Sequence, residues 1–272
     1  MKKVMVGLVV LLSVTAFVNA AEEETALPQD LEVTLDLSYT SKYIWRGFDV
    51  LGDQGAWQPS INVDLSNGFT ANIWASYSDS SGTNDAGDSR VNATEYNYTL
   101  AYNGSAWGDS AWKTDYQVGW RYYDFIDSAT RDADVQELFL TGSMPALTGV
   151  GVVPRFGVFQ MWEAWSGGAT RDYSGTIYQV GFGYDFNTSQ VTGSTDNNVP
   201  LTFSWDIVYN DGTGGQSVEH DLSHMVWGLG TSLTCPVTGA TITPTLYFQN
   251  SFEDSVNSED ELWLNLSFAF KF

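Results

Sequence analysis

The sequence predicts an all-β protein: a closed antiparallel transmembrane β-barrel of the outer-membrane type, with about 12 strands. Three observations predict it. Apolar and polar residues alternate along most of the chain, aromatic residues gather toward the ends of the alternating runs, and the connections between runs tend to alternate between short and long. No linker or shift of composition divides residues 31–272, so we expect one barrel domain over this range.

The alternation is strict in the first run. From Leu31 to Tyr39 the odd positions are apolar or aromatic and the even positions are polar, which is the pattern of a strand with two different faces. Most runs reach the ~9–11 residues that a tilted strand needs to cross a membrane. The later runs lie at 57–65, 69–77, 95–102, 113–122, 137–144, 154–163, 177–186, 201–210, 224–234, 241–249 and 261–272.

A soluble β-sandwich also alternates, but two further patterns favour the membrane barrel. The first is a set of aromatic residues on the apolar face near strand ends, as in the aromatic girdles of barrels: Tyr43, Trp45, Trp57, Tyr77, Tyr96, Trp120, Tyr122, Trp162, Tyr178 and Tyr209. The second is the rhythm of the connections, since barrels have short turns at one rim and long loops at the other. Short connections lie at 66–68, 144–152 and 236–240, long acidic ones at 78–94, 124–136, 163–174, 211–223 and 250–260, and 187–199 departs from the rhythm.

We expect a targeting signal at each end of the sequence. Residues 1–20 have a basic start, an apolar stretch from Val4 to about Val18, and small residues before a cleavage site after Ala20, which is the three-part pattern of a secretory signal peptide. A short acidic segment, 21–30, follows it. The last run ends with apolar residues on one face, and we expect Phe268, Phe270 and Phe272 to form the signal that the barrel-assembly machinery reads.

Charge and cysteine content exclude other classes of function. Removing Lys2 and Lys3 with the signal peptide leaves nine basic residues (11 minus two) against 33 acidic ones, a net charge of −24. Such a chain is not expected to bind nucleic acid. Cys235 is the single cysteine, so no internal disulfide forms. The acidic segment 250–261 lacks the spacing of a calcium loop, and no cofactor or metal is expected.

The opposite face of the strands is expected to line the lumen. Extending the parity of the first strand through residue 46 places Lys42 and Arg46 on this face, and Tyr43 and Trp45 on the apolar one. A network of structural ion pairs is the favoured interpretation of the lumen charges, and a charge filter for solutes is the alternative. The predicted lumen charge cluster is Lys42, Arg46, Lys113, Arg121, Arg155, Asp36, Asp64, Asp115 and Asp206, and the same parity holds for Glu32, Glu95, Glu137, Glu163, Asp185, Glu261 and Lys271.

Signals for catalysis are few. The two histidines, His220 and His224, lie near Glu219 and Ser223, but neighbours in one loop rarely form a triad, which is a spatial arrangement. We therefore expect a solvated loop here, with His224 starting the next strand on the lumen face, and no catalytic residues.

The segment from Tyr39 to Asp79, together with the terminal Phe272, resembles a broad group of uncharacterised bacterial outer-membrane β-barrel proteins. The match rests on a Tyr-x-Trp-Arg-Gly motif, with Arg46 and Gly47, and on Pro59 and Ile61 in the next strand. The resemblance implies a β-barrel fold and does not indicate which solute such a barrel would transport.

The sequence thus predicts a protein of the bacterial outer membrane, either a narrow porin-like channel or a structural barrel with a charged lumen. A lipid-modifying barrel enzyme and a surface adhesion or ligand-binding barrel are the alternatives. The expected partners are outer-membrane lipids and lipopolysaccharide, the barrel-assembly machinery, and small solutes or ions.

Overall fold

A computed structural model describes residues 31–79, 94–126, 133–164, 174–192 and 198–272. The predicted signal peptide, the acidic segment 21–30 and parts of several predicted long loops lie outside the described residues. The chain divides into two units, Met1–Leu31 and Glu32–Phe272. The second unit is the barrel.

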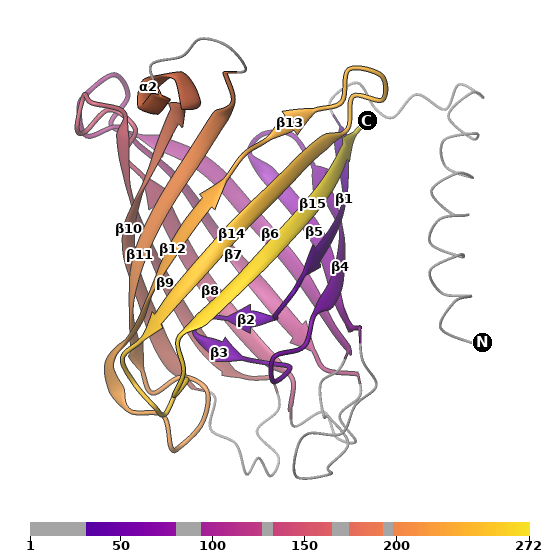
Figure 1. Ribbon diagram of the computed structural model, residues 1–272. Coiled ribbons are helices and arrows are strands. Elements are labelled where there is room, and N and C mark those ends of the chain that lie inside the picture. Colours follow the sequence, from indigo (N-terminus) through magenta and orange to yellow (C-terminus); the bar gives the residue numbers. More distant parts are fainter. Residues whose placement is uncertain (1–30, 80–93, 127–132, 165–173, 193–197) are drawn as a thin grey trace, which may run out of the picture. The chain divides into compact units, whose positions relative to one another are not determined.

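Twelve antiparallel strands close into a barrel, as the sequence predicts (Figure 1). The first strand pairs with the last, in a register that runs from Thr34 opposite Lys271 to Thr40 opposite Asn265. Closure satisfies the backbone groups that an open sheet would leave unpaired in lipid. The strands are β1 (Glu32–Thr40), β4 (Ala56–Asp64), β5 (Phe69–Ser78), β6 (Thr94–Ala106), β7 (Thr114–Asp124), β8 (Val135–Ser143), β9 (Val152–Glu163), β10 (Gly175–Asn187), β11 (Pro200–Asp211), β12 (His220–Gly230), β14 (Thr241–Ser251) and β15 (Glu261–Lys271).

The two rims of the barrel differ. We term the rim where β1 begins and β15 ends the terminus rim, and the opposite one the loop rim. The short helix α2 (Thr188–Thr192) and the short strand β13 (Leu233–Thr234) both lie in connections at the terminus rim (Figure 1). They occupy the two longest connections at the terminus rim. Residues 187–199 depart from the predicted alternation of short and long connections because this connection contains α2.

Among the described residues, no helix has the length and apolar character needed to cross a membrane.

The outer face of the barrel is apolar and exposed. Ile61, Ile73, Leu100, Leu138 and Val180 are each about half exposed, on strands whose alternate residues point into the lumen. Apolar exposure on this scale would be unfavourable in water and is the expected surface toward lipid.

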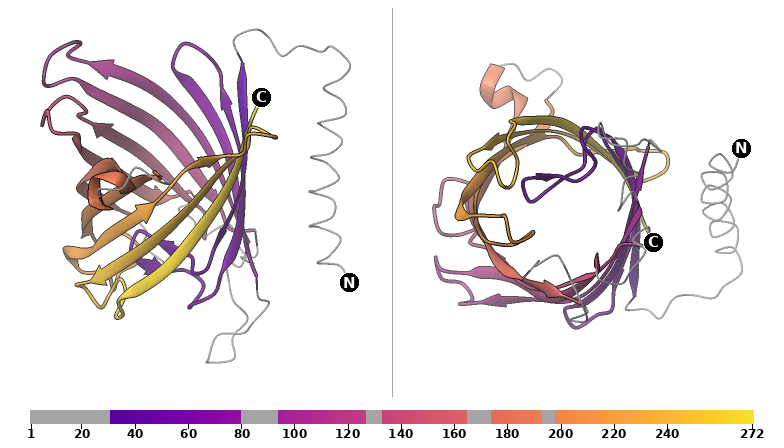
Figure 2. Two further views of the ribbon diagram at one scale, coloured as in Figure 1. Left: turned by 45° about the horizontal axis from the view of Figure 1, so that its top comes forward. Right: turned by 90° about the horizontal axis from the view of Figure 1, so that it is seen from below.

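The connection between β1 and β4 folds into the lumen instead of standing clear of the barrel. It contains a two-stranded hairpin, β2 (Ile44–Trp45) and β3 (Phe48–Asp49). Figure 2, in its right-hand view, shows this hairpin inside the ring of strands. We term residues 41–55 the inner hairpin.

The inner hairpin corrects one sequence prediction. Tyr43 and Trp45 do not join the aromatic girdle on the lipid face. Tyr43 is only 7% exposed, and the Trp45 ring packs edge-on against Tyr123 in the lumen, with centroids 5.8 Å apart. The physical reason is that β1 ends at Thr40, so a turn interrupts the period of two on which the prediction relied.

Candidate functional site in the barrel lumen

Arg46 fastens the inner hairpin to the far wall of the barrel. Its Nη2 donates to Oε2 of Glu137 at 2.5 Å, and its guanidinium lies 3.7 Å from the ring centroid of Phe159. The guanidinium lies over the rings of both Trp45 and Phe159. The parity of the first strand had instead placed Arg46 on the face opposite Tyr43 and Trp45. A guanidinium over an aromatic face is attracted by the ring quadrupole, and more strongly where water is excluded.

Glu137 on β8 collects three donors. Besides Arg46, the hydroxyl of Tyr123 donates to it at 3.0 Å and Nη1 of Arg121 at 3.4 Å. The Glu137 side chain has no exposed area, whereas Arg46 retains 13% and Arg121 29%. A buried carboxylate needs such partners because desolvation penalises its charge. We term Arg46, Arg121, Tyr123 and Glu137 the Glu137 cluster.

Gly47 allows the tip of the inner hairpin to touch the wall made by β12 and β14. Its φ is +96°, and a Cβ added there would lie 2.5 Å from Nδ1 of His224. The Gly47 carbonyl accepts a hydrogen bond from Nε2 of Gln249 at 2.9 Å. A residue with a side chain would be strained by the positive φ and would clash with the histidine.

Lys42 and Tyr43 hold the base of the inner hairpin. Lys42 Nζ forms ion pairs with Asp53 and with Glu261, the latter at 2.7 Å, and these hydrogen bonds raise the pKa of Lys42 above its ordinary value. The Tyr43 hydroxyl donates to Glu95 at 2.9 Å. The segment is therefore attached to β6, β8, β14 and β15, and it narrows the lumen.

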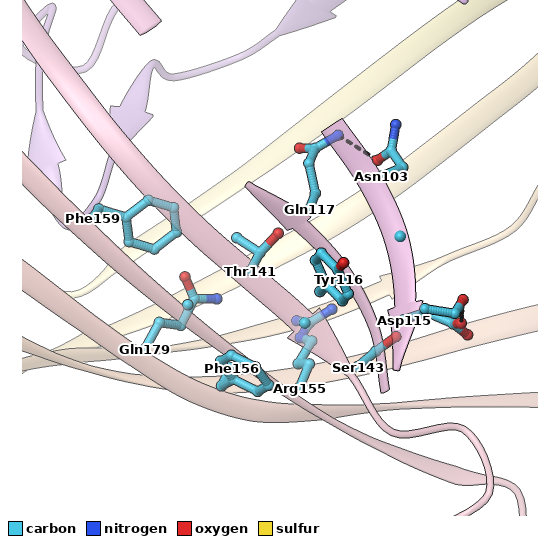
Figure 3. A pocket seen from close by; sticks show the side chains of 14 residues that line it. Asn103, Asp115, Tyr116, Gln117, Thr141, Ser143, Arg155, Phe156, Phe159 and Gln179 are labelled. Atoms are coloured by element: carbon cyan, nitrogen blue, oxygen red, sulfur yellow. Dashed lines mark hydrogen bonds between the residues drawn. The ribbon is translucent and has the colours of Figure 1, made fainter. Parts of the chain in front are cut away.

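In the part of the lumen toward the terminus rim, a cavity of about 750 Å³ is lined by residues of β6 to β10 (Figure 3). We term it the vestibule. Polar side chains cover part of its wall, and the amide of Gln117 donates to Asn103 at 2.9 Å. The Arg155 guanidinium binds Asp206 through two hydrogen bonds, one of them from Nε to Oδ1 at 2.7 Å. This pair crosses β10 at Gly181, where a Cβ would meet the Asp206 carboxylate.

We term the half of the lumen toward the terminus rim the terminus half, and the opposite one the loop half. Other charged residues of the terminus half lie close to the rim or are exposed to water. Lys113 lies in the turn before β7, and its Nζ is 3.5 Å from Asp115. Lys271 pairs with Glu32 at 2.7 Å. Three carboxylates have no basic partner among the described residues and accept only neutral donors: Asp36 from the Ser267 hydroxyl, Asp64 from the backbone N–H of Ser66, and Asp185 from the Thr202 hydroxyl.

The predicted lumen charges therefore form separate groups and not one cluster. Arg46 and Arg121 meet at Glu137, Arg155 meets Asp206, Lys113 meets Asp115, and Lys42 is held at the base of the inner hairpin. The alternation placed Glu137 on the lumen face but did not predict that Glu137 accepts from three donors. Phe159, His224 and Gln249 were missed as contacts of the inner hairpin, because a contact between a loop and distant strands leaves no periodic signal.

Ser223 is not in a solvated loop, which corrects the sequence prediction, whereas His224 lies in a strand and faces the lumen as expected. Strand β12 already begins at His220, and an irregularity in its register opposite Val208 and Tyr209 brings both side chains to buried positions. Ser223 Oγ donates to the Val208 carbonyl at 3.2 Å and lies 2.8 Å from His224 Nδ1. The exposed fractions are 1% and 2%, so the pair is enclosed by the wall and the inner hairpin.

The terminal residues of the predicted assembly signal lie on the closing strand. Phe268 and Phe270 belong to the face of β15 that packs beside β1, opposite Leu37 and Leu35. Phe272 follows the strand, and its N–H donates to the Val33 carbonyl at 2.8 Å. Phe270 and Phe272 are 40% and 50% exposed.

Comparison with known proteins gives the fold and no closer relationship. No protein-family model and no curated protein matches the chain. Among solved structures, the barrel is similar to the NanC porin (TM-score 0.51, 8% identity, covering 88% of this chain and 100% of that one) and to the KdgM porin (0.50, 9%, 88% and 99%). It is also similar to an outer membrane channel from Pseudomonas putida F1 (0.50, 11%, 92% and 98%). At these identities the similarity shows the fold that the chain shares with outer-membrane porins.

Proposed function

We propose that the protein is a bacterial outer-membrane β-barrel that acts as a narrow porin-like channel. This proposal rests on the polar lining and the open space of the lumen. The lumen is lined by polar and charged side chains and contains a vestibule of about 750 Å³, and the inner hairpin narrows it without being part of the wall. Side chains can fill the interior of a barrel of about eight strands, whereas wider barrels leave space for a ligand or a channel. The likeness to the KdgM and NanC porins in fold supports the same reading.

The enzyme alternative has weaker support. A serine nucleophile must reach its substrate, and Ser223 is buried with its hydroxyl donating to a backbone carbonyl. The partners that we propose are those of any such barrel: outer-membrane lipids and lipopolysaccharide around its apolar face, and the assembly machinery at its closing strand.

The charge of the lumen favours cations and neutral solutes over anions. Each of the six basic residues that the described part of the barrel contains forms an ion pair. Their fields are thus largely cancelled locally, whereas Asp36, Asp64 and Asp185 keep negative charges without a basic partner. Charged side chains lining a pore select ions of opposite sign.

The test is conductance of the mature protein refolded and inserted into a planar lipid bilayer. We expect discrete conductance steps, and in a tenfold KCl gradient a reversal potential of the sign given by cation preference. Replacing Asp36, Asp64 and Asp185 by Asn together should move that potential toward zero. Folded protein that inserts without conducting would reject the channel, whereas anion preference would reject only the assignment of charge.

The side of the membrane that each rim faces is testable with the native cysteine. We propose that the terminus rim faces the periplasm. Cys235 lies in a turn at this rim, and hydrogen bonds from Thr238 lower the pKa of its thiol, which favours the reactive thiolate. A membrane-impermeant maleimide should leave Cys235 unlabelled in intact cells and label it after permeabilisation. In a Cys235→Ser background, Ser258→Cys at the exposed loop rim should be labelled in intact cells, and the reverse pattern would invert the orientation.

A further inference from the structure

A second cavity, of about 480 Å³, lies between the inner hairpin and the wall formed by β1, β4 to β7, β14 and β15. We term it the aromatic chamber. Its volume falls in the range of about 300–1,000 Å³ that small-molecule sites occupy. From its lining we propose that the chamber binds a ring of an uncharged sugar.

Aromatic rings form part of the lining of the aromatic chamber. Tyr247 on β14 and Trp263 on β15 point into the lumen and stack with centroids 5.2 Å apart and planes at 20°. Trp74 on β5 adds a further ring, packed on Tyr43 of the inner hairpin. Flat apolar faces in a polar lumen suit a ligand that is apolar on its faces and polar at its edge. A sugar ring has this form, with C–H groups on its faces and hydroxyl groups around its edge.

Asn97 is a buried polar residue of the same lining. Its side chain lines the chamber and is 92% buried, being 8% exposed. A side-chain hydrogen bond joins Asn97 to Glu95, and because a carboxylate accepts, the Asn97 amide nitrogen is the donor. The Asn97 Oδ1 atom has no hydrogen-bond partner among the described residues. A buried acceptor without a partner is costly, and a ligand hydroxyl would satisfy it. Gln58 and Asn265 bring two more amides to the same wall.

The chamber offers nothing to balance a ligand charge. Arg121 is the one charged residue that lines it, and its guanidinium is already bonded to Glu137, to the Tyr123 hydroxyl and to the Thr99 hydroxyl. A charged group placed here would lose hydration without gaining a free counter-charge. The ligand class is therefore neutral. The inference rests on the proposed function in one respect, that the lumen is the route by which the ligand arrives.

The test is a titration of the refolded mature protein with maltotriose and with cellotriose, read by tryptophan fluorescence. The protein is held in a zwitterionic detergent, because a detergent with a sugar head group would compete. We expect a saturable change with at least one of the two trisaccharides and at least tenfold weaker binding of trigalacturonate, which has the same size but carries charge.

Variants test the location. Trp263→Leu should weaken binding about tenfold, equivalent to about 1.4 kcal/mol, and Asn97→Leu should weaken it as well. Trp227→Leu makes the same change on the lipid face and should leave the affinity unchanged, with folding of all variants checked by heat-modifiable gel mobility. Absence of saturable binding by either neutral sugar, tighter binding of trigalacturonate, or equal losses in the Trp263 and Trp227 variants would overturn the proposal. Because binding is read in micelles, a barrel that binds without conducting rejects the channel and not the chamber, and a barrel that conducts without binding does the reverse.

Discussion

The loop half and the terminus half of the lumen arise from the same alternating strands, yet they differ in how many of their carboxylates are buried. In the loop half the inner hairpin covers the wall, and Glu137 and Glu95 are buried with bonded partners. In the terminus half nothing comparable enters the lumen among the described residues. Asp64 and Asp185 are exposed, Asp36 is half-buried, and all three accept from neutral partners. The difference shows that the inner hairpin buries lumen charges which the strand pattern alone would leave exposed. Asp206 is also buried, but by its pair with Arg155 on the barrel wall.

The energetics follow from burial. A carboxylate deprived of water must be compensated in full, so losing its partner is costly, whereas a wet carboxylate gains little from any neighbour. The loop half should therefore respond to substitution through stability and pore size, and the terminus half through ion selectivity.

The largest effect is expected from removing the inner hairpin. Thr40 and Ala56 are already opposite each other in the ladder, so a Gly-Ser linker of about four residues can join β1 to β4 in place of residues 42–54. Conductance in a planar bilayer should rise several-fold, because the constriction leaves with the segment.

The control is to replace the 144–151 turn at the terminus rim with a Gly-Ser linker of about four residues, which should leave the conductance unchanged. A barrel without the inner hairpin that folds and conducts as before would show that the narrow point lies elsewhere, and the distinction between the two halves would lose its basis.

A substitution at Glu137 should have the next largest effect. Glu137→Gln keeps the shape of the side chain but removes the negative charge that faces Arg46 and Arg121. Breaking a buried ion pair costs roughly 3–5 kcal/mol, and the residual exposure of the two arginines places the loss toward the lower figure. Urea unfolding in detergent micelles, followed by tryptophan fluorescence, measures the change in the free energy of unfolding. A loss below about 1 kcal/mol, the scale of an exposed pair, would mean that the Glu137 cluster is solvated.

The strands could be predicted from the sequence, and the inner hairpin could not. Period-two alternation reports which residues of a strand share a face, and this placed Asp36, Arg121, Arg155 and Asp206 on the lumen side. The rule requires a continuous strand. It failed after Thr40, where the chain turns, and so it misplaced Tyr43 and Trp45.

The lumen site was partly predictable for the same reason. Parity identifies a face but not the depth at which a side chain lies, nor its neighbours across the barrel. Arg46 and Glu137 are 91 residues apart and meet only because a loop folds inward. One local signal was present: Gly47 directly follows Arg46, and a glycine at a positive φ marks a tight turn in which no side chain fits.

The smallest effect is expected at Asp36, where the same kind of change is made in the terminus half. Asp36→Asn exchanges a carboxylate for an amide, as Glu137→Gln does, but Asp36 accepts only from the Ser267 hydroxyl. The amide oxygen of Asn can still accept that bond, and no cation is left without a partner. The free energy of unfolding should therefore change by less than about 1 kcal/mol, measured in the same urea titration. Cation preference in the bilayer should weaken at the same time, since one uncompensated negative charge is gone. If Asp36→Asn instead destabilised the barrel as much as Glu137→Gln, the carboxylates of both halves would be structural, and burial by the inner hairpin would no longer explain their difference.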